Sequence, residues 1–250
     1  MRKHLVWVLA LAVAIGAAGI AWGAVTETMQ GSVSPKKLPK KKAKPVKLRI
    51  ASSARDASDP SARPSPSTVV NYDLDKDIKI FTTGLKTCNP NSISSSSTAQ
   101  ANQKCGKARI SVPGTVPWGG AGNPLNSAVV RTPVGDIPAV VTAFAGQNQT
   151  IVVHTVNSVT GTTVLVAKVK KGPAGYGKTI SAPTPPLAGG TATLIDFTTT
   201  IKKRFFYRGK KRSVVSSSCR DKKIKFQVRS SRQDGTTASD TAVQTCIQKG

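Results

Sequence analysis

The stretch that decides the fold runs Cys219-Arg-Asp-Lys-Lys-Ile-Lys-Phe-Gln-Val-Arg229, continues through the polar segment Gln233-Asp-Gly-Thr236, and ends with Ala242-Val-Gln-Thr-Cys246. In its first part, every second residue from Ile224 to Val228 is apolar, and the residues between them are polar or cationic. This period of two predicts a strand with one apolar and one cationic face. The Asp-Gly pair in the polar segment predicts a hairpin turn, because glycine adopts a positive φ without steric cost. A cysteine at each outer end could close this hairpin covalently.

Short strands of the same kind are expected along most of the chain. Threonine, serine, valine, glycine and proline are abundant, and Glu27 is the only glutamate among the 250 residues. This composition favours β-sheet over helix. We expect a first strand within 45–50, two strands or one bent strand within 69–81, and further strands near 108–112, 127–132, 139–144, 150–156, 163–170, 191–201, 213–218, 224–229 and 241–246.

About ten to twelve strands without a strand–helix–strand rhythm predict an all-β fold, and more specifically an antiparallel β-sandwich of jelly-roll or immunoglobulin-like type. One short helix is expected over 98–105, with Ser97 as its N-cap and Gly106 as its stop. The segment 51–68 is rich in Ser, Pro, Asp and Arg and shows no periodicity, so we expect a long exposed loop there.

The first two dozen residues predict a secretory signal peptide over 1–24. Basic residues at 2–4 precede an apolar run from Leu5 to Ile20, and Gly23 offers a small residue for cleavage. An uncleaved anchor is the alternative, because the run is about long enough to span a bilayer. We therefore expect a secreted protein, extracellular or associated with the cell envelope, that has no transmembrane domain once the signal is cleaved.

The processed chain is strongly basic. Removing Arg2 and Lys3 from the 37 basic residues leaves 35 against 11 acidic ones, a net charge of about +24. The residues from 25 to 44 predict a flexible basic arm. Those from 45 to 250 predict a single β-sandwich domain, which is long enough to bury a core of its own.

Four cysteines on an exported chain predict two disulfides. Three pairings are open, and Cys88 with Cys105 and Cys219 with Cys246 is favoured because each pair is local and brackets one supersecondary unit. A zinc site is disfavoured, because no Cys-x-x-Cys spacing exists and His154 is the only histidine after the signal. No cofactor is expected.

Several short blocks of sequence carry a resemblance to known proteins. They include Thr83-Gly-Leu-Lys-Thr-Cys88, Cys105-Gly-Lys-Ala108, Ile151-Val-Val-His154 and Phe206-Tyr-Arg-Gly-Lys-Lys-Arg-Ser213, together with the cysteine hairpin already quoted. As a set, over about residues 33 to 250, these blocks resemble a group of secreted actinobacterial proteins of unassigned function. The resemblance implies export, two disulfides and a β-rich fold, and it carries over no catalytic residue.

Any hypothesis that the protein is a serine hydrolase depends on His154. As the sole histidine of the processed chain, it would have to be the base of a Ser-His-Asp device, yet no Gly-x-Ser-x-Gly motif accompanies it. It lies among β-branched residues, which favours a packed histidine that forms a local hydrogen bond.

Asp73, Asp75 and Asp77 alternate, so an extended strand would place their carboxylates on one face. Three oxygen donors could hold Ca²⁺, but the glycine and the distal glutamate of an EF-hand loop are missing. The same carboxylates could form a glycosidase pair, although neither has the apolar setting that raises a pKa. The alternative is a solvated acidic patch that pairs with neighbouring lysines.

Trp118 and Tyr176 lie on glycine-rich loops, where exposed aromatic rings could stack on sugars. A calcium-dependent carbohydrate-binding module is therefore one alternative function, beside a secreted hydrolase. A single loop aromatic more often anchors its loop to the core.

Charge is the strongest functional signal. Two basic clusters stand out, and their binding candidates are Lys36, Lys37, Lys40, Lys41, Lys42, Lys202, Lys203, Arg204, Arg208, Lys210, Lys211 and Arg212. An exported surface of this kind attracts anionic cell-wall or extracellular polymers without specificity for a nucleic acid sequence. The alternative is a cationic surface that serves solubility and has no partner. The prediction is a non-catalytic binding or structural protein of the envelope or the extracellular space.

Overall fold

The computed structural model describes residues 24–113 and 126–249, and most of them lie in β-strands. The large sheet contains β1 (Val25–Ser34), β4 (Lys47–Asp56), β5 (Ser67–Asp75), β7 (Ser127–Thr132), β8 (Gly135–Ala145), β9 (Thr150–Asn157), β10 (Gly161–Lys171), β11 (Tyr176–Pro183), β12 (Thr193–Ile201), β16 (Lys223–Arg232) and β17 (Thr237–Thr245). The short strands are β2 (Lys37–Pro39), β3 (Lys44–Pro45), β6 (Ile78–Ile80), β13 (Arg204–Tyr207), β14 (Lys210–Ser213), β15 (Val215–Ser217) and β18 (Ile247–Lys249). The helical segments are α1 (Thr98–Cys105) and three 3₁₀ turns, Pro90–Ile93, Gly106–Ala108 and Ala188–Gly190.

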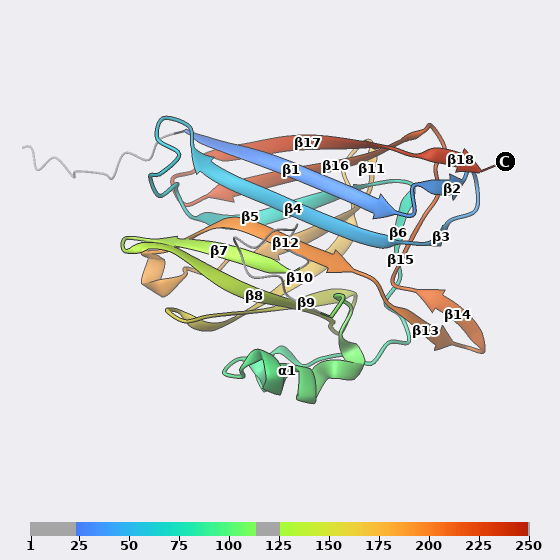
Figure 1. Ribbon diagram of the computed structural model, residues 1–250, viewed down its shortest axis with the longest axis horizontal. Helices are drawn as coiled ribbons and strands as arrows, with labels where there is room; N and C mark the ends of the chain where they lie inside the picture. Colours follow the sequence, from blue (N-terminus) through green and yellow to red (C-terminus); the bar gives the residue numbers. More distant parts are fainter. Residues whose placement is uncertain (1–23, 114–125, 250) are drawn as a thin grey trace, which may run out of the picture.

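The large sheet has eleven strands in the order β1-β4-β12-β7-β8-β9-β10-β11-β5-β16-β17. All of its neighbouring strands pair antiparallel. The sheet curls until its two edge strands, β1 and β17, lie side by side (Figure 1). The all-β prediction is confirmed, whereas the sandwich is not, because the strands form one barrel-like sheet instead of two packed sheets.

The closing seam between β1 and β17 is built from side chains. In an antiparallel sheet with an odd number of strands the two edge strands run in the same direction. Asp240 accepts a hydrogen bond from the backbone N–H of Met29 at 2.7 Å. Gln244 accepts from the N–H of Val33 at 2.6 Å and donates to the carbonyl of Val33 at 3.0 Å. Beyond this point β2 and β18 continue the seam as a parallel backbone ladder.

The predicted hairpin around the second cysteine pair is confirmed. β16 and β17 pair from Lys223 opposite Thr245 to Ser231 opposite Thr237, and Gly235 in the turn has a φ of +81°. Both favoured disulfides are present, with Cα–Cα separations of 5.3 Å for Cys88–Cys105 and 6.1 Å for Cys219–Cys246.

The interior of the sheet follows the period of two that the sequence shows. Ile224, Phe226 and Val228 are fully buried, and they pack in one cluster with apolar residues of β1, β4 and β5. The ring of Phe226 lies against Gly31 of β1, where a Cβ atom would come within 2.1 Å of the ring. The absence of a side chain at Gly31 therefore makes room for the phenyl ring of Phe226.

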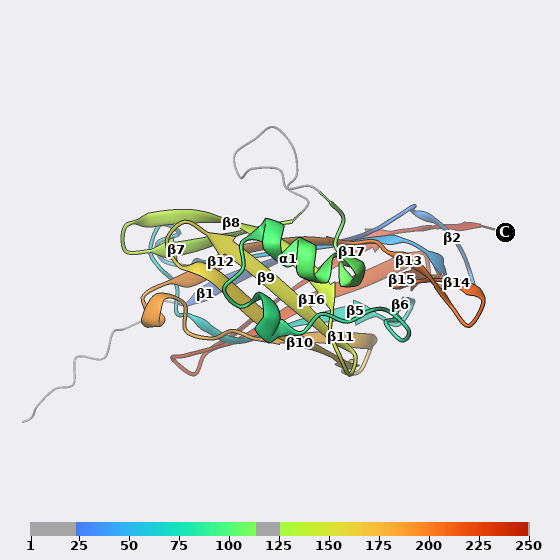
Figure 2. The same cartoon turned by 90° about the horizontal axis from the view of Figure 1, so that it is seen from below.

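A second, smaller core lies outside the sheet. Helix α1 covers the outer face of β8 and β9 (Figure 2). The Cys88–Cys105 disulfide, Ile93, Phe144 and Val152 pack together there. The predicted helix is confirmed with its bounds, and Ser97 and Gln100 form a capping box at its start.

Three stretches differ from their predictions. The interval 108–112, expected to be a strand, contains the end of a 3₁₀ turn followed by isolated bridges at Arg109 and Ser111. The interval 25–44, expected to be a flexible arm, contains β1, which pairs with β4 along its whole length, and the short strand β2. The expected loop 51–68 begins later, because β4 continues to Asp56. The signal-peptide prediction falls almost entirely on residues 1–23, outside the described part of the chain.

Candidate anion-binding surface at one end of the sheet

The two basic clusters of the sequence meet at one end of the large sheet, at the right of Figure 1. Strand β15 holds them together, since it pairs with β3 on one side and with β6 on the other. β15 also follows directly after the β13–β14 hairpin, which carries the second cluster. Residues more than 150 positions apart in the sequence thus form one surface, which we call the basic end.

Eleven of the twelve predicted binding residues are exposed there. The exception is Lys203, which is half-buried and donates a hydrogen bond from Nζ to the carbonyl of Lys107 at 2.8 Å. Burial lowers the pKa of Lys203. Lys203 therefore stabilises the local chain, whereas the side chains of the other eleven residues are exposed to solvent.

The basic end is hollowed by a groove with a volume of about 560 Å³. Five cationic residues line it, and no carboxylate is among the described residues that do so. They come from the turn after β5 and from β6, β11 and β14: Lys76, Lys79, Lys178, Lys211 and Arg212. We call this hollow the basic groove.

A second hollow of about 270 Å³ lies next to the basic groove. Its cations are Lys47, Lys202 and Arg204, and it shares Pro45 and Ser213 with the groove. Both hollows are thus parts of one continuous positively charged surface.

The β13–β14 hairpin is fixed to this end by aromatic rings. Phe81 stacks on Phe205 with ring centroids 6.0 Å apart and meets Tyr207 edge-on at 5.9 Å. Gly84 allows the ring of Tyr207 to come close, since a Cβ at this glycine would lie 2.0 Å from it. These ring contacts fix the position of the hairpin, and with it the positions of the cationic side chains that the hairpin carries.

Cations of the hairpin lie over aromatic rings at this end, both on the hairpin and at Phe81. The guanidinium of Arg212 lies 5.6 Å from the centre of the Phe81 ring, and the ammonium of Lys211 lies 5.8 Å from that of Phe206. Phe206 is 68% exposed, which is unusual for a phenylalanine. The tip of the hairpin thus offers an apolar surface surrounded by positive charge.

The carboxylates of the aspartate trio are already used by the protein. Asp73 accepts hydrogen bonds from Thr179 and from Arg229, and Asp77 accepts them from Arg220. Asp75 accepts from two backbone N–H groups, those of residues 77 and 225, at 2.8 and 2.9 Å. The described residues contain no group of three His, Cys, Asp or Glu side chains that could hold a metal ion. The partners are arginines, a threonine hydroxyl and backbone N–H groups, not the lysine side chains that the sequence suggested.

His154 is fully buried on the outer face of β9. Its Nε2 lies 2.9 Å from the carbonyl oxygen of Ser96, so Nε2 carries the hydrogen and donates it. Burial lowers the pKa of the ring, and Nδ1 is buried with no hydrogen-bond partner among the described residues. The geometry is that of a packed histidine and does not form a catalytic device.

Of the two aromatic candidates for a sugar site, the structure describes only Tyr176. Tyr176 is half-buried at the start of β11, opposite Asp75. Trp118 lies outside the described residues.

The sequence analysis missed a buried ion pair inside the sheet, between Arg232 and Glu27. Arg232 donates to Glu27 and, at 2.6 Å, to the carbonyl of Ser65, and Ser230 also donates to Glu27 at 2.6 Å. Desolvation raises the pKa of Glu27 and lowers that of Arg232, so burial opposes the charge on both partners. The signal that could have found this pair is that Arg232 continues the inward-facing positions of β16.

Lysines of the groove were also missed by the sequence analysis. Lys76, Lys79 and Lys178 are dispersed in the chain, so no local cluster marks them. All five ion pairs among the described residues use arginine, and none of them involves a lysine. The lysines of the basic end are therefore not neutralised by these pairs.

The described residues define a disulfide-bonded all-β protein with a barrel-like sheet and one cationic end. Comparisons of the chain with protein-family models, with curated proteins and with solved structures give no match in any of the three. Among the described residues, no helix has both the length and the apolar character needed to cross a membrane.

Proposed function

We propose that this chain is an exported, non-catalytic binding protein of the cell envelope or the extracellular space, and that its basic end binds anionic polymers. The observation that carries the proposal is the basic groove, in which five cations converge with no carboxylate among the described lining residues.

Elementary electrostatics explains why such a groove binds polyanions. Cations that share a concave surface add their fields and raise the local concentration of an anionic ligand. A polymer that neutralises several of them releases several counterions, so its affinity falls steeply with salt. A repeating polyanion gains from every cation along the groove, whereas a single small anion gains from only one or two.

The test is co-sedimentation of the processed protein with purified cell wall and with an acidic polysaccharide across a salt series. The double variant Lys79→Glu/Lys211→Glu reverses two charges of the groove. The matched control, Lys168→Glu/Lys223→Glu, makes the same change in net charge at exposed lysines outside both hollows.

We expect the groove variant to bind at least tenfold more weakly near physiological salt, and the control to lose much less. Equal losses in the two variants would mean attraction by net charge alone and would contradict a role for the groove. Absence of binding at low salt would reject the proposed function altogether.

A further inference from the structure

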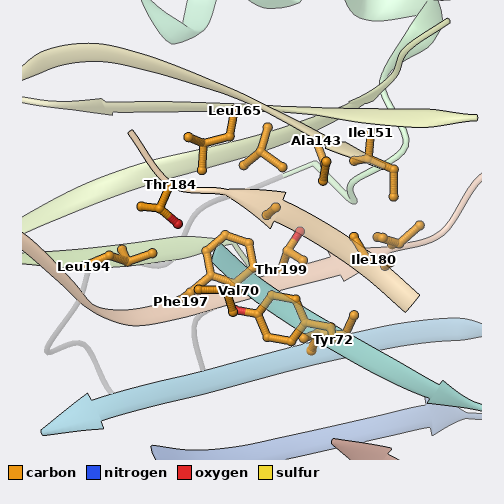
Figure 3. Close-up of a pocket in the computed structure, with 15 residues that line it drawn as sticks. Val70, Tyr72, Ala143, Ile151, Leu165, Ile180, Thr184, Leu194, Phe197 and Thr199 are labelled. Carbon is orange, nitrogen blue, oxygen red and sulfur yellow. The ribbon is translucent and has the colours of Figure 1, made fainter. Parts of the chain in front are cut away.

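The interior of the large sheet contains a cavity that the proposed function does not use. It has a volume of about 50 Å³, and fifteen side chains from β4, β5, β8, β9, β10, β11 and β12 and the residue after β11 line it. Most of these side chains are aliphatic or aromatic, and they point toward one another across the interior (Figure 3). We propose that this cavity binds the end of an unbranched alkyl chain of a single-chain amphiphile.

The chemistry of the wall excludes water as a good occupant. A buried water needs two to four polar partners. The hydroxyl of Tyr72 is already hydrogen-bonded to Ser52 at 2.8 Å, and that of Thr199 donates to Asn126 at 3.3 Å. Two of the three hydroxyls of the wall are thus hydrogen-bonded within the protein, and the third, that of Thr184, belongs to a partly exposed residue. The rest of the wall is apolar, so the space favours an apolar occupant.

The cavity has a closed end and a more open end. Ala143, Ile151 and Ile201 form part of the closed end, and each is at most 2% exposed. Val70, Leu165 and Leu194 also face the interior, yet they are partly exposed. An occupant would therefore enter past these residues and place its tip near Ala143.

The size of the cavity selects the shape of the ligand. Cavities of about 150 Å³ admit benzene, and whole-ligand pockets usually exceed about 300 Å³. A cavity a third as large as the benzene-sized one excludes rings and accepts only the narrow end of a chain. The rest of the amphiphile would remain outside, beyond the partly exposed residues.

The position of the cavity makes it independent of the basic end. The basic groove and the cavity share strand β11, but the start of this strand lines the groove and its later residues line the cavity, so no residue lines both. In Figure 3 the cavity lies between Leu165 and Ile151 on one wall and Phe197 and Tyr72 on the other. Binding of an alkyl chain in the cavity and binding of an anionic polymer at the basic end can therefore be tested separately, and either proposal can fail while the other holds.

The experiment measures the Tm of the full processed protein with the neutral probe 1-octanol, which the cationic surface does not attract. We expect Tm to rise by several degrees and to keep rising with the logarithm of the octanol concentration. The caged alcohol 1-adamantanol has similar polarity but a bulky hydrocarbon part, so it should produce no rise. Phosphatidylcholine vesicles form a further arm, and a rise with vesicles alone would overturn the assignment to a free single chain.

The variant Ala143→Val adds two carbons at the closed end and should abolish the octanol-induced rise. The control Ile93→Val removes one carbon from the separate core under α1, so it should lower Tm but keep the rise. In the wild-type protein, intermolecular NOEs should connect the octanol chain with methyl groups of Ala143, Ile151 and Leu165, whether or not the variant folds. Absence of these NOEs, or an equal rise in Ala143→Val or with adamantanol, would overturn the proposal.

Discussion

At the scale of single residues, the contact between Gly31 and Phe226 shows how one missing side chain shapes the interior. A Cβ at Gly31 would lie 2.1 Å from Cγ of the ring, and Phe226 is fully buried, so the ring cannot swing away. The fit between strands β1 and β16 therefore depends on glycine at this position.

We expect Gly31→Ala to lower the free energy of unfolding by about 1–3 kcal/mol, because overpacking forces side chains out of their preferred rotamers. In a protein of this size such a loss lowers Tm by about 2–4 °C per kcal/mol. The control is Gly106→Ala, since Gly106 has a helical φ of −57° and open space around its Cα. Thermal unfolding of both variants tests this, and a Tm of Gly31→Ala equal to that of the control would contradict it.

His154 makes stability depend on pH in a definite direction. Burial lowers the pKa of its ring in the folded protein below the usual 6.5, so the unfolded chain takes up a proton first as the pH falls. Stability therefore falls as the pH drops through 6.5, and this loss ends below the folded pKa.

The prediction is that His154→Gln removes this dependence, because the glutamine amide does not titrate and can still donate to Ser96. Urea unfolding at pH 7.5, 6.5 and 5.5 should show a larger loss of stability in the wild type than in the variant. Parallel curves for the two proteins would show that the buried ring contributes nothing to the pH dependence.

At the scale of elements, the seam between β1 and β17 differs from every other strand contact in the large sheet. Gln244 supplies both hydrogen bonds of Val33 from its side chain, in place of a backbone ladder. Val33 is 1% exposed, so water has poor access to these groups when the glutamine is removed.

We expect Gln244→Ala to cost about 1–3 kcal/mol, since it leaves a buried N–H and a buried C=O without partners. Thr241→Ala is the control, because Thr241 is an exposed residue of the same strand. Urea unfolding measures the cost, and hydrogen exchange at the Val33 amide shows where it arises. Unchanged exchange at Val33 would mean that the seam is held by other contacts.

The elements also show what the sequence could and could not predict. The β16–β17 hairpin and helix α1 were predictable, because a period of two, an Asp-Gly turn and a capping box are local signals. Strand β1 was not, because its inward positions include Glu27 and Gly31, which break the apolar alternation. The buried carboxylate of Glu27 is compensated by its ion pair with Arg232 and by a hydrogen bond from Ser230, and Gly31 leaves room for the ring of Phe226.

At the scale of the whole molecule, closure of the sheet and convergence of the basic clusters were beyond the sequence. Both depend on contacts between residues that are distant in the sequence. Nothing in the local sequence around Asp240 or Gln244 indicates that these side chains bond to the backbone of β1. Of the twelve residues expected to bind anionic polymers, eleven are exposed and Lys203 is half-buried, and their binding stays a prediction. The groove itself needed Lys79 and Lys178, which only the fold brings beside the β13–β14 hairpin.

The seam also sets the order in which the molecule can assemble. Its side-chain hydrogen bonds join residues 211 positions apart in the sequence, so they cannot form until nearly the whole chain is available. Contacts of such long range make folding slow, because the entropy of closing the loop must be lost before the contacts form. Until β17 arrives, the free edge of β1 and the apolar interior remain open to other chains. Closure of the seam is therefore the step that ends the period in which the newly made protein is most prone to aggregate.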